Sequence, residues 1–98
     1  MSWNLYLDDE RMASKERPYM LARTVAEARD FVNALGPPRF MSLDHDLGGA
    51  STTMDFLKWL VQNLGDVGAI PDYQVHSANP VGRDNIIAFM ESWKKSRA

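Results

Sequence analysis

The chain has 98 residues, no cysteine, 11 Lys and Arg against 13 Asp and Glu, and a net charge of -2. These values exclude disulfides, thiolate metal sites and an overall positive field that would concentrate nucleic acid or anionic lipid. Because 45% of the residues are hydrophobic and no apolar run approaches the roughly 20 residues that cross a bilayer, we expect one globular domain over residues 1–98, located in the cytoplasm.

Short apolar runs alternate with segments of helical period from the beginning of the chain. Residues 3–7 (WNLYL) and 19–23 (YMLAR) are rich in strand-forming side chains. Thr24 and Glu27 then form a capping-box pattern that begins a helix, which Gly36 ends. The segment between the two strands has barely the dozen or so residues that a parallel crossover needs. A helix there must be very short or absent.

The same alternation continues in the second half. Residues 39–43 (RFMSL) predict a buried strand and residues 52–64 a helix. Residues 73–76 (YQVH) predict a short strand, after which Asn79 as N-cap and Pro80 at the first helical position begin a last helix. The pattern predicts an α/β domain with a four-stranded, mostly parallel sheet that has helices on both sides.

Polar and ionisable side chains gather directly after three of the predicted strands. In open parallel sheets ligands bind beyond the carboxyl ends of the strands, and neighbouring strands lie only about 4.8 Å apart. Both histidines of the chain belong to this group, which favours an active site over a merely polar rim. The group comprises Asp8, Asp9, Glu10 and Arg11, then Asp44, His45 and Asp46, and finally His76, Ser77 and Asn79.

Each of these residues also has a structural interpretation. Asp8 and Asp9 are suited to capping a turn, and His45 to donating to a backbone carbonyl. Asn79 is suited first to capping the last helix and only second to contacting a ligand. Arg83 is suited to a solvent-exposed position without a functional role. Taken one at a time, the residues leave both interpretations open.

Three stretches, "LYLDDER", "SLDHDLGG" and "VHSANPVGRDN", together resemble the cyclic-phosphate-processing receiver domain, a compact relative of response-regulator receivers. The resemblance implies a small receiver-like (flavodoxin-like) three-layer domain, truncated because no fifth strand with its lysine follows. It matches Asp8 and Asp9 to the acidic pair of receivers, Asp44 to their central aspartate and Ser77 to their Ser or Thr. A divalent cation, Mg²⁺ or another, held by Asp8, Asp9 and Asp44 follows from it.

The narrower family is distinguished by two histidines, here His45 and His76, and the resemblance therefore implies processing of a cyclic phosphate. One imidazole would take a proton from water while the other protonates the departing sugar oxygen, and Asp44 or Asp46 would orient one ring. We predict a phosphoesterase for the cyclic phosphate of a nucleotide or nucleotide-derived small molecule. The predicted catalytic residues are His45, His76 and Asp44, and the predicted substrate contacts are Ser77, Asn79, Arg83, Asp46 and Arg11.

Two alternatives stay open from the sequence. The first is a catalytically inactive receiver-like module that binds a nucleotide or a protein partner, which the small size and the missing lysine favour. The second is a metal-dependent phosphohydrolase in which both histidines and the aspartates are ligands. The sequence alone thus leaves open whether the domain is an enzyme.

Overall fold

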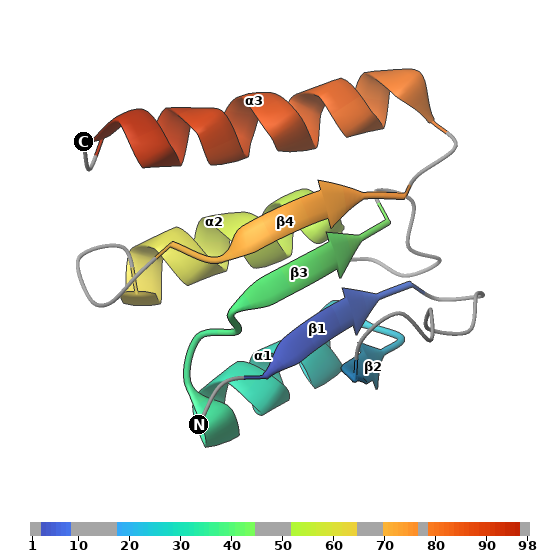
Figure 1. Cartoon of the computed structure of the whole chain (residues 1–98), viewed down its shortest axis with the longest axis vertical. Helices are drawn as coiled ribbons and strands as arrows, with labels where there is room; N and C mark the ends of the chain where they lie inside the picture. The colour runs from blue at the N-terminus through green and yellow to red at the C-terminus, as the bar shows by residue number, and fades with distance from the viewer. Residues whose placement is uncertain (1–2, 9–17, 45–51, 65–69, 77–78, 97–98) are drawn as a thin grey trace.

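The computed structural model describes residues 3–8, 18–44, 52–64, 70–76 and 79–96. Its elements follow the predicted alternation of strands and helices, with boundaries that differ by one or two residues (Figure 1). In chain order they are β1 (Asn4–Leu7), β2 (Tyr19–Ala22), α1 (Val25–Leu35), β3 (Phe40–Leu43), α2 (Thr53–Leu64), β4 (Asp72–Val75) and α3 (Pro80–Ser96).

The strands form one sheet in the order β2-β1-β3-β4, and every neighbouring pair is parallel. The register is uniform: Tyr6 of β1 lies beside Ser42 of β3, which lies beside Gln74 of β4. This confirms the predicted α/β class and the four-stranded parallel sheet. Because the strands are parallel, their carboxyl ends all meet at one edge.

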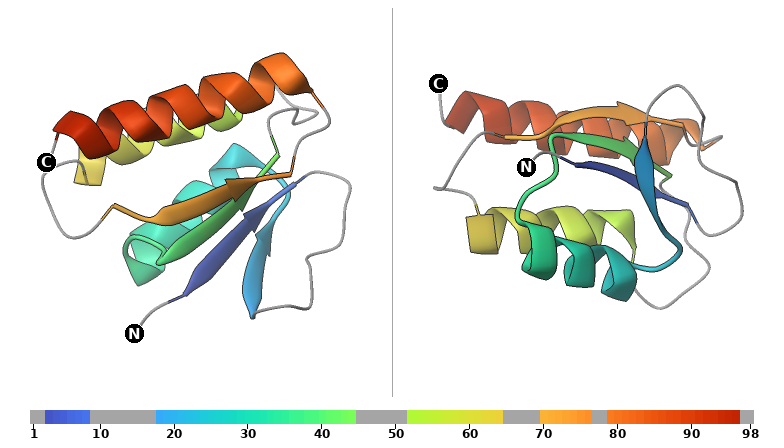
Figure 2. Two further views of the ribbon diagram at one scale, coloured as in Figure 1. Left: turned by 45° about the horizontal axis from the view of Figure 1, so that its top comes forward. Right: turned by 60° about the horizontal axis from the view of Figure 1, so that its bottom comes forward.

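The core lies between the sheet and the helices. Helices α1 and α2 lie behind the sheet in Figure 1, and α3 runs along β4 (Figures 1 and 2). Side chains alternate along a strand, so the core receives every second strand residue. Fully buried core residues are Leu5, Leu7, Met41 and Leu43 from the strands, Phe56, Leu57 and Leu60 from α2, and Ile86 and Met90 from α3.

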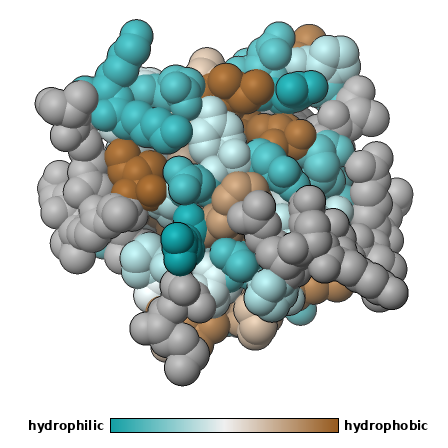
Figure 3. All heavy atoms as spheres, viewed as in Figure 1, coloured by the Kyte–Doolittle hydropathy of each residue, from teal (hydrophilic) through white to brown (hydrophobic). Residues whose placement is uncertain are grey.

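The opposite face of the sheet carries Tyr6, Ser42 and Gln74, and none of the three described helices covers it. The three-layer arrangement expected from the sequence, with helices on both sides, is therefore met on one side only within the described ranges. Viewed from this side, hydrophilic and hydrophobic residues are mixed over the described surface (Figure 3). Among the same residues, no helix has both the length and the apolar content that a bilayer crossing requires.

Helix α1 begins and ends as the sequence predicts. The Thr24 side chain accepts a hydrogen bond from the backbone N–H of Glu27 at 3.1 Å, and the Glu27 carboxylate accepts one from the N–H of Arg23 at 3.0 Å. Gly36 ends the helix with a φ of 83°, a conformation that glycine adopts without steric cost, and its N–H donates to the carbonyl of Val32. The turn after Gly36 leads the chain back into the sheet at β3.

Helix α3 is attached to β4 by a polar contact at the surface. The Tyr73 hydroxyl donates to the Glu91 carboxylate at 2.8 Å, and the Lys94 ammonium lies 5.1 Å from the centre of the Tyr73 ring. Burial, and then the hydrogen bond and negative charge of Glu91, raise the pKa of Tyr73 to about 12. The neutral phenol is thus the form that suits this contact.

The contact gives a pH-dependent stability that can be measured. Since the pKa of Tyr73 is higher in the folded state than its ordinary value of 10.0, the folded state holds the extra proton between these two values. We expect this contribution to the free energy of unfolding to be complete below about pH 10 and to be lost as the pH rises towards about 12. Chemical denaturation at several alkaline pH values, compared between wild type and Tyr73→Phe, isolates the effect. A Tyr73 titration midpoint near 10 in the difference absorbance spectrum would contradict it.

Candidate active site

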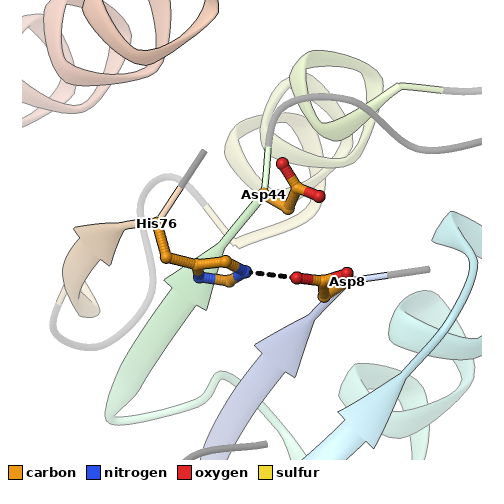
Figure 4. A group of neighbouring side chains, drawn as sticks. All are labelled: Asp8, Asp44 and His76. Atoms are coloured by element: carbon orange, nitrogen blue, oxygen red, sulfur yellow. Dashed lines mark hydrogen bonds and ion pairs between the residues drawn. The ribbon is translucent and has the colours of Figure 1, made fainter. Parts of the chain in front are cut away.

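Asp8, Asp44 and His76 lie in one row at the carboxyl ends of three neighbouring strands (Figure 4). Each is the residue directly after its strand and continues the parallel ladder through its backbone. The N–H of Asp44 donates to the carbonyl of Leu7 at 2.9 Å, and the N–H of His76 to that of Leu43 at 2.9 Å. The sheet therefore fixes where these three side chains begin.

The side chains of His76 and Asp8 meet across the end of β3. Nε2 of His76 lies 2.9 Å from Oδ2 of Asp8, and only 14% and 1% of the two side chains are exposed. Because β3 separates β4 from β1, the imidazole reaches over one strand to make this contact (Figure 4). The Asp44 carboxylate stands beside the pair, and one ligand atom of each residue lies within 4.8 Å of the others. Two carboxylates and one imidazole thus converge on one point.

Residues within the strands hold the Nδ1 side and one face of the His76 ring. Nδ1 lies 2.8 Å from the hydroxyl oxygen of Ser42, and the side-chain amide of Gln74 donates to that oxygen at 3.1 Å. The Tyr6 ring stacks on the imidazole, with centroids 4.7 Å apart and an interplanar angle of 15°. Tyr6, Ser42 and Gln74 are register partners, so the sheet places all three beneath the ring.

Asp8 is fully buried, which makes its partners important. An ionised carboxylate removed from water is costly unless hydrogen bonds and nearby positive groups compensate it. His76 supplies one such hydrogen bond at the carboxylate, and the Arg23 guanidinium reaches the backbone carbonyl of Asp8 at 3.4 Å. Removing His76 would therefore leave a buried acid with one partner fewer.

Ser42, His76 and Asp8 are the residue types of a hydrolytic Ser-His-Asp triad, but their placement is different. Ser42 lies within β3, two residues before the sheet edge, and none of its surface is exposed. Its hydroxyl already contacts both His76 and Gln74. A nucleophile must reach the substrate, so the geometry favours Ser42 as a partner of the ring and not as an attacking group.

The chemistry of the row fits a divalent cation at the two carboxylates. Carboxylate oxygens are the ligands that Mg²⁺ prefers, and Asp8 and Asp44 bring theirs together. Two of the three predicted metal ligands are therefore adjacent, while the third, Asp9, lies outside the described residues. The structure adds His76 to the group, although both its ring nitrogens face protein atoms, Ser42 and Asp8.

The remaining predicted residues divide into two sets. Asn79 caps α3: its side-chain oxygen accepts a hydrogen bond from the backbone N–H of Gly82 at 3.1 Å, as its structural interpretation required. Arg83 lies exposed on the first turn of α3, and its N–H donates to the Asn79 carbonyl. Arg11, His45, Asp46 and Ser77 lie outside the described residues, as Asp9 does.

Sequence reasoning missed the supporting residues of the site. The sequence predicts Tyr6 and Ser42 only as strand residues, and Thr53 only as part of the helix over residues 52–64. In the structure the Thr53 hydroxyl donates to the Asp44 carbonyl. One signal was available for Ser42: it is a polar residue inside an apolar run, two positions before Asp44 and therefore on the same face of the sheet. Gln74 stands in the same relation to His76.

The energetic link between His76 and Asp8 can be measured by a double-mutant cycle. Since the contact is largely buried and involves a charged acceptor, we expect His76→Ala and Asp8→Ala to be coupled by about 1 to 3 kcal/mol in the free energy of unfolding. Chemical denaturation of the wild type, both single variants and the double variant gives the value. The exposed Lys94 and Glu91 pair is the control, and its coupling should be much smaller. Single-variant effects that simply add would contradict a direct contact.

Comparison with known proteins assigns the chain to a family. No curated protein and no solved structure matches it. The sequence profile of the cyclic-phosphate processing receiver domain, in contrast, matches residues 3–92, which include every described strand and most of α3. The match agrees with the parallel sheet and with the acidic and histidine residues at its carboxyl edge. The chain therefore belongs to the cyclic-phosphate processing receiver domain family.

Proposed function

We propose that this domain is a phosphoesterase that opens the cyclic phosphate of a nucleotide or nucleotide-derived small molecule. The observation that carries the proposal is the row of Asp8, Asp44 and His76, in which an imidazole and two carboxylates converge at the ligand-binding edge of a parallel sheet. Membership of a family associated with cyclic-phosphate processing supplies the substrate class.

The reaction needs one group to take a proton and one to give a proton. Water attacks phosphorus, one ring P–O bond breaks, and the departing sugar oxygen receives a proton, which leaves a phosphomonoester. In the proposal His76 works from Nε2, exchanging its contact with Asp8 for one with the substrate. Ser42 and Tyr6 keep the ring oriented, and the negative charge of the nearby Asp8 carboxylate stabilises its protonated form. His45 is the proposed second group.

A divalent cation has a natural place in this scheme. When bound, it would offset the negative charge of the phosphate, and its proposed ligands in the described row are Asp8 and Asp44. His76 remains a proton carrier, because its Nε2 already faces Asp8. At the start of α3, the exposed Arg83 is the proposed contact for a phosphate oxygen.

One observation favours the non-catalytic alternative, a module that binds a nucleotide without turning it over. Both ring nitrogens of His76 contact protein groups, Ser42 and Asp8. This arrangement is compatible with a purely structural role, in which the ring only supports the buried Asp8. The two functions differ in whether His76 must release Asp8. Activity measurements separate them.

Turnover tests the catalytic proposal. A panel of cyclic nucleotides and cyclic sugar phosphates is incubated with the full chain, with and without a chelator, and the phosphomonoester product is quantified. We expect His76→Ala to lower turnover by about 10² to 10⁴ relative to wild type, because proton transfer is lost. Tyr73→Phe, which alters a contact with α3 on the other face of the sheet, should retain full activity. Binding of a panel member without turnover by wild type would establish the binding module instead.

Cation binding tests the assignment of ligands. We expect Asp44→Asn to weaken Mn²⁺ binding by at least the roughly 10- to 100-fold that loss of a supporting partner costs at metal sites. His76→Gln should weaken it less than Asp44→Asn does, since the ring supports the ligand Asp8 and is not itself a proposed ligand. Titration calorimetry with Mn²⁺ and Mg²⁺ measures both. Equal losses in the two variants would make His76 a ligand and favour the metal-dependent phosphohydrolase.

A further inference from the structure

We infer that Ser42 and Gln74 are positioning residues that hold His76 in the tautomer with its hydrogen on Nε2, directed at Asp8 and the edge of the sheet. The inference deepens the proposed function and rests on it for its catalytic consequence, because Nε2 is the nitrogen from which the proposal has His76 transfer a proton once the ring is protonated. The tautomer is measured by spectroscopy and does not depend on turnover. The inference and the proposed function can therefore fail separately.

Counting donors and acceptors fixes the direction of the chain of hydrogen bonds from Gln74. An amide nitrogen only donates, so the Gln74 side chain donates to the Ser42 oxygen at 3.1 Å. The other contact of the Ser42 hydroxyl among the described residues is Nδ1 of His76, 2.8 Å away, so the single hydrogen of this buried hydroxyl is satisfied only when Nδ1 accepts it. A neutral imidazole has one donor nitrogen and one acceptor nitrogen. With Nδ1 accepting, Nε2 carries the hydrogen.

The contact at the Asp8 end of this series of hydrogen bonds selects the same tautomer. In its ionised form, which the proposed cation requires, the Asp8 carboxylate only accepts, so Oδ2, 2.9 Å from Nε2, then requires a hydrogen on that nitrogen. In the opposite tautomer a bare Nε2 lone pair would face the buried Asp8 oxygen. Both ends therefore select one tautomer, and each bond in the series from Gln74 to Asp8 donates in the same direction.

The sheet supplies the rigidity that this selection needs. Ser42 is fully buried within β3, and Gln74 and Tyr6 flank it in register. The stacked Tyr6 ring restricts rotation of the imidazole, so Nδ1 stays over Ser42. A turn of the ring by half a revolution would replace Nδ1 by a carbon and lose the hydrogen bond. Ser42 thus sets the tautomer, and Tyr6 sets the plane.

The test measures the tautomer of His76 in the full chain by long-range ¹H–¹⁵N correlation NMR at about pH 8, above the usual range for histidine. His76→Gln assigns the signals, because the chain has two histidines. We expect a protonated Nε2 and an unprotonated Nδ1 in wild type. Ser42→Ala should shift the nitrogen signals towards a mixture of tautomers, and Ser42→Thr, which restores the hydroxyl, should return them to the wild-type positions.

Gln74 provides a second variant at an exposed position, where substitution does not disturb the core. Gln74→Met keeps the length of the side chain without the amide donor and should move the same signals in the same direction, by less. Asp72→Asn, exposed and two residues away on β4, is the matched control and should leave them unchanged. In the turnover assay, Ser42→Ala should lower kcat by about 10- to 100-fold, as loss of a supporting partner does, with little change in KM.

The outcomes are distinct. A wild-type signal with the hydrogen on Nδ1 or on both nitrogens would overturn the inference, as would a Ser42→Ala or Gln74→Met variant that is folded but indistinguishable from wild type. If Ser42→Ala does not fold, Gln74→Met decides. The expected tautomer together with no turnover of any cyclic phosphate would leave the inference standing and overturn the proposed function.

Discussion

The parallel register of β1, β3 and β4 is the constraint on which the site depends. It brings together His76 and Asp8, which are 68 positions apart in the chain, by placing each one residue beyond a strand that ends at the same edge. A shift of one residue in either pairing would turn the affected side chains to the opposite face of the sheet. The hydrophobic pattern prevents this, since Leu7 and Leu43 are fully buried against the helices only in the observed register.

The polar residues buried near this edge are compensated by specific partners. Asp8 contacts His76, Ser42 contacts both His76 and Gln74, and Thr53 donates to the Asp44 carbonyl. Partnered groups of this kind avoid most of the desolvation cost that burial would otherwise impose. The indole N–H of Trp93 in α3 is different: it is buried without a hydrogen-bond partner among the described residues. The network thus concentrates at the edge of the sheet, where the proposed chemistry takes place.

The position of His76 explains how one arrangement is compatible with either a catalytic or a binding role. The ring is restrained on both nitrogens and on one face, which orients it well but engages its Nε2 hydrogen with Asp8. Catalysis needs that contact to be exchanged with the substrate, whereas binding leaves it in place. The orientation imposed by Ser42 and Tyr6 benefits both roles, since a preorganised ring has less conformational freedom to lose when a ligand arrives.

Patterns along the sequence were enough to predict the local structure and the set of residues at the strand ends. Apolar periodicity and the caps at Thr24, Gly36 and Asn79 depend on neighbours within a few positions, so the elements and their order were predictable. The packed fold was needed to show that Asp44 lies between Asp8 and His76. It was also needed to show that Ser42, Gln74 and Tyr6 hold the imidazole. Those relations depend on strand order and register, which arise from pairing between distant segments, and on side chains such as Ser42 that look like ordinary strand residues. The same holds for the helices: local periodicity predicts that they form, but only packing decides which face of the sheet they cover.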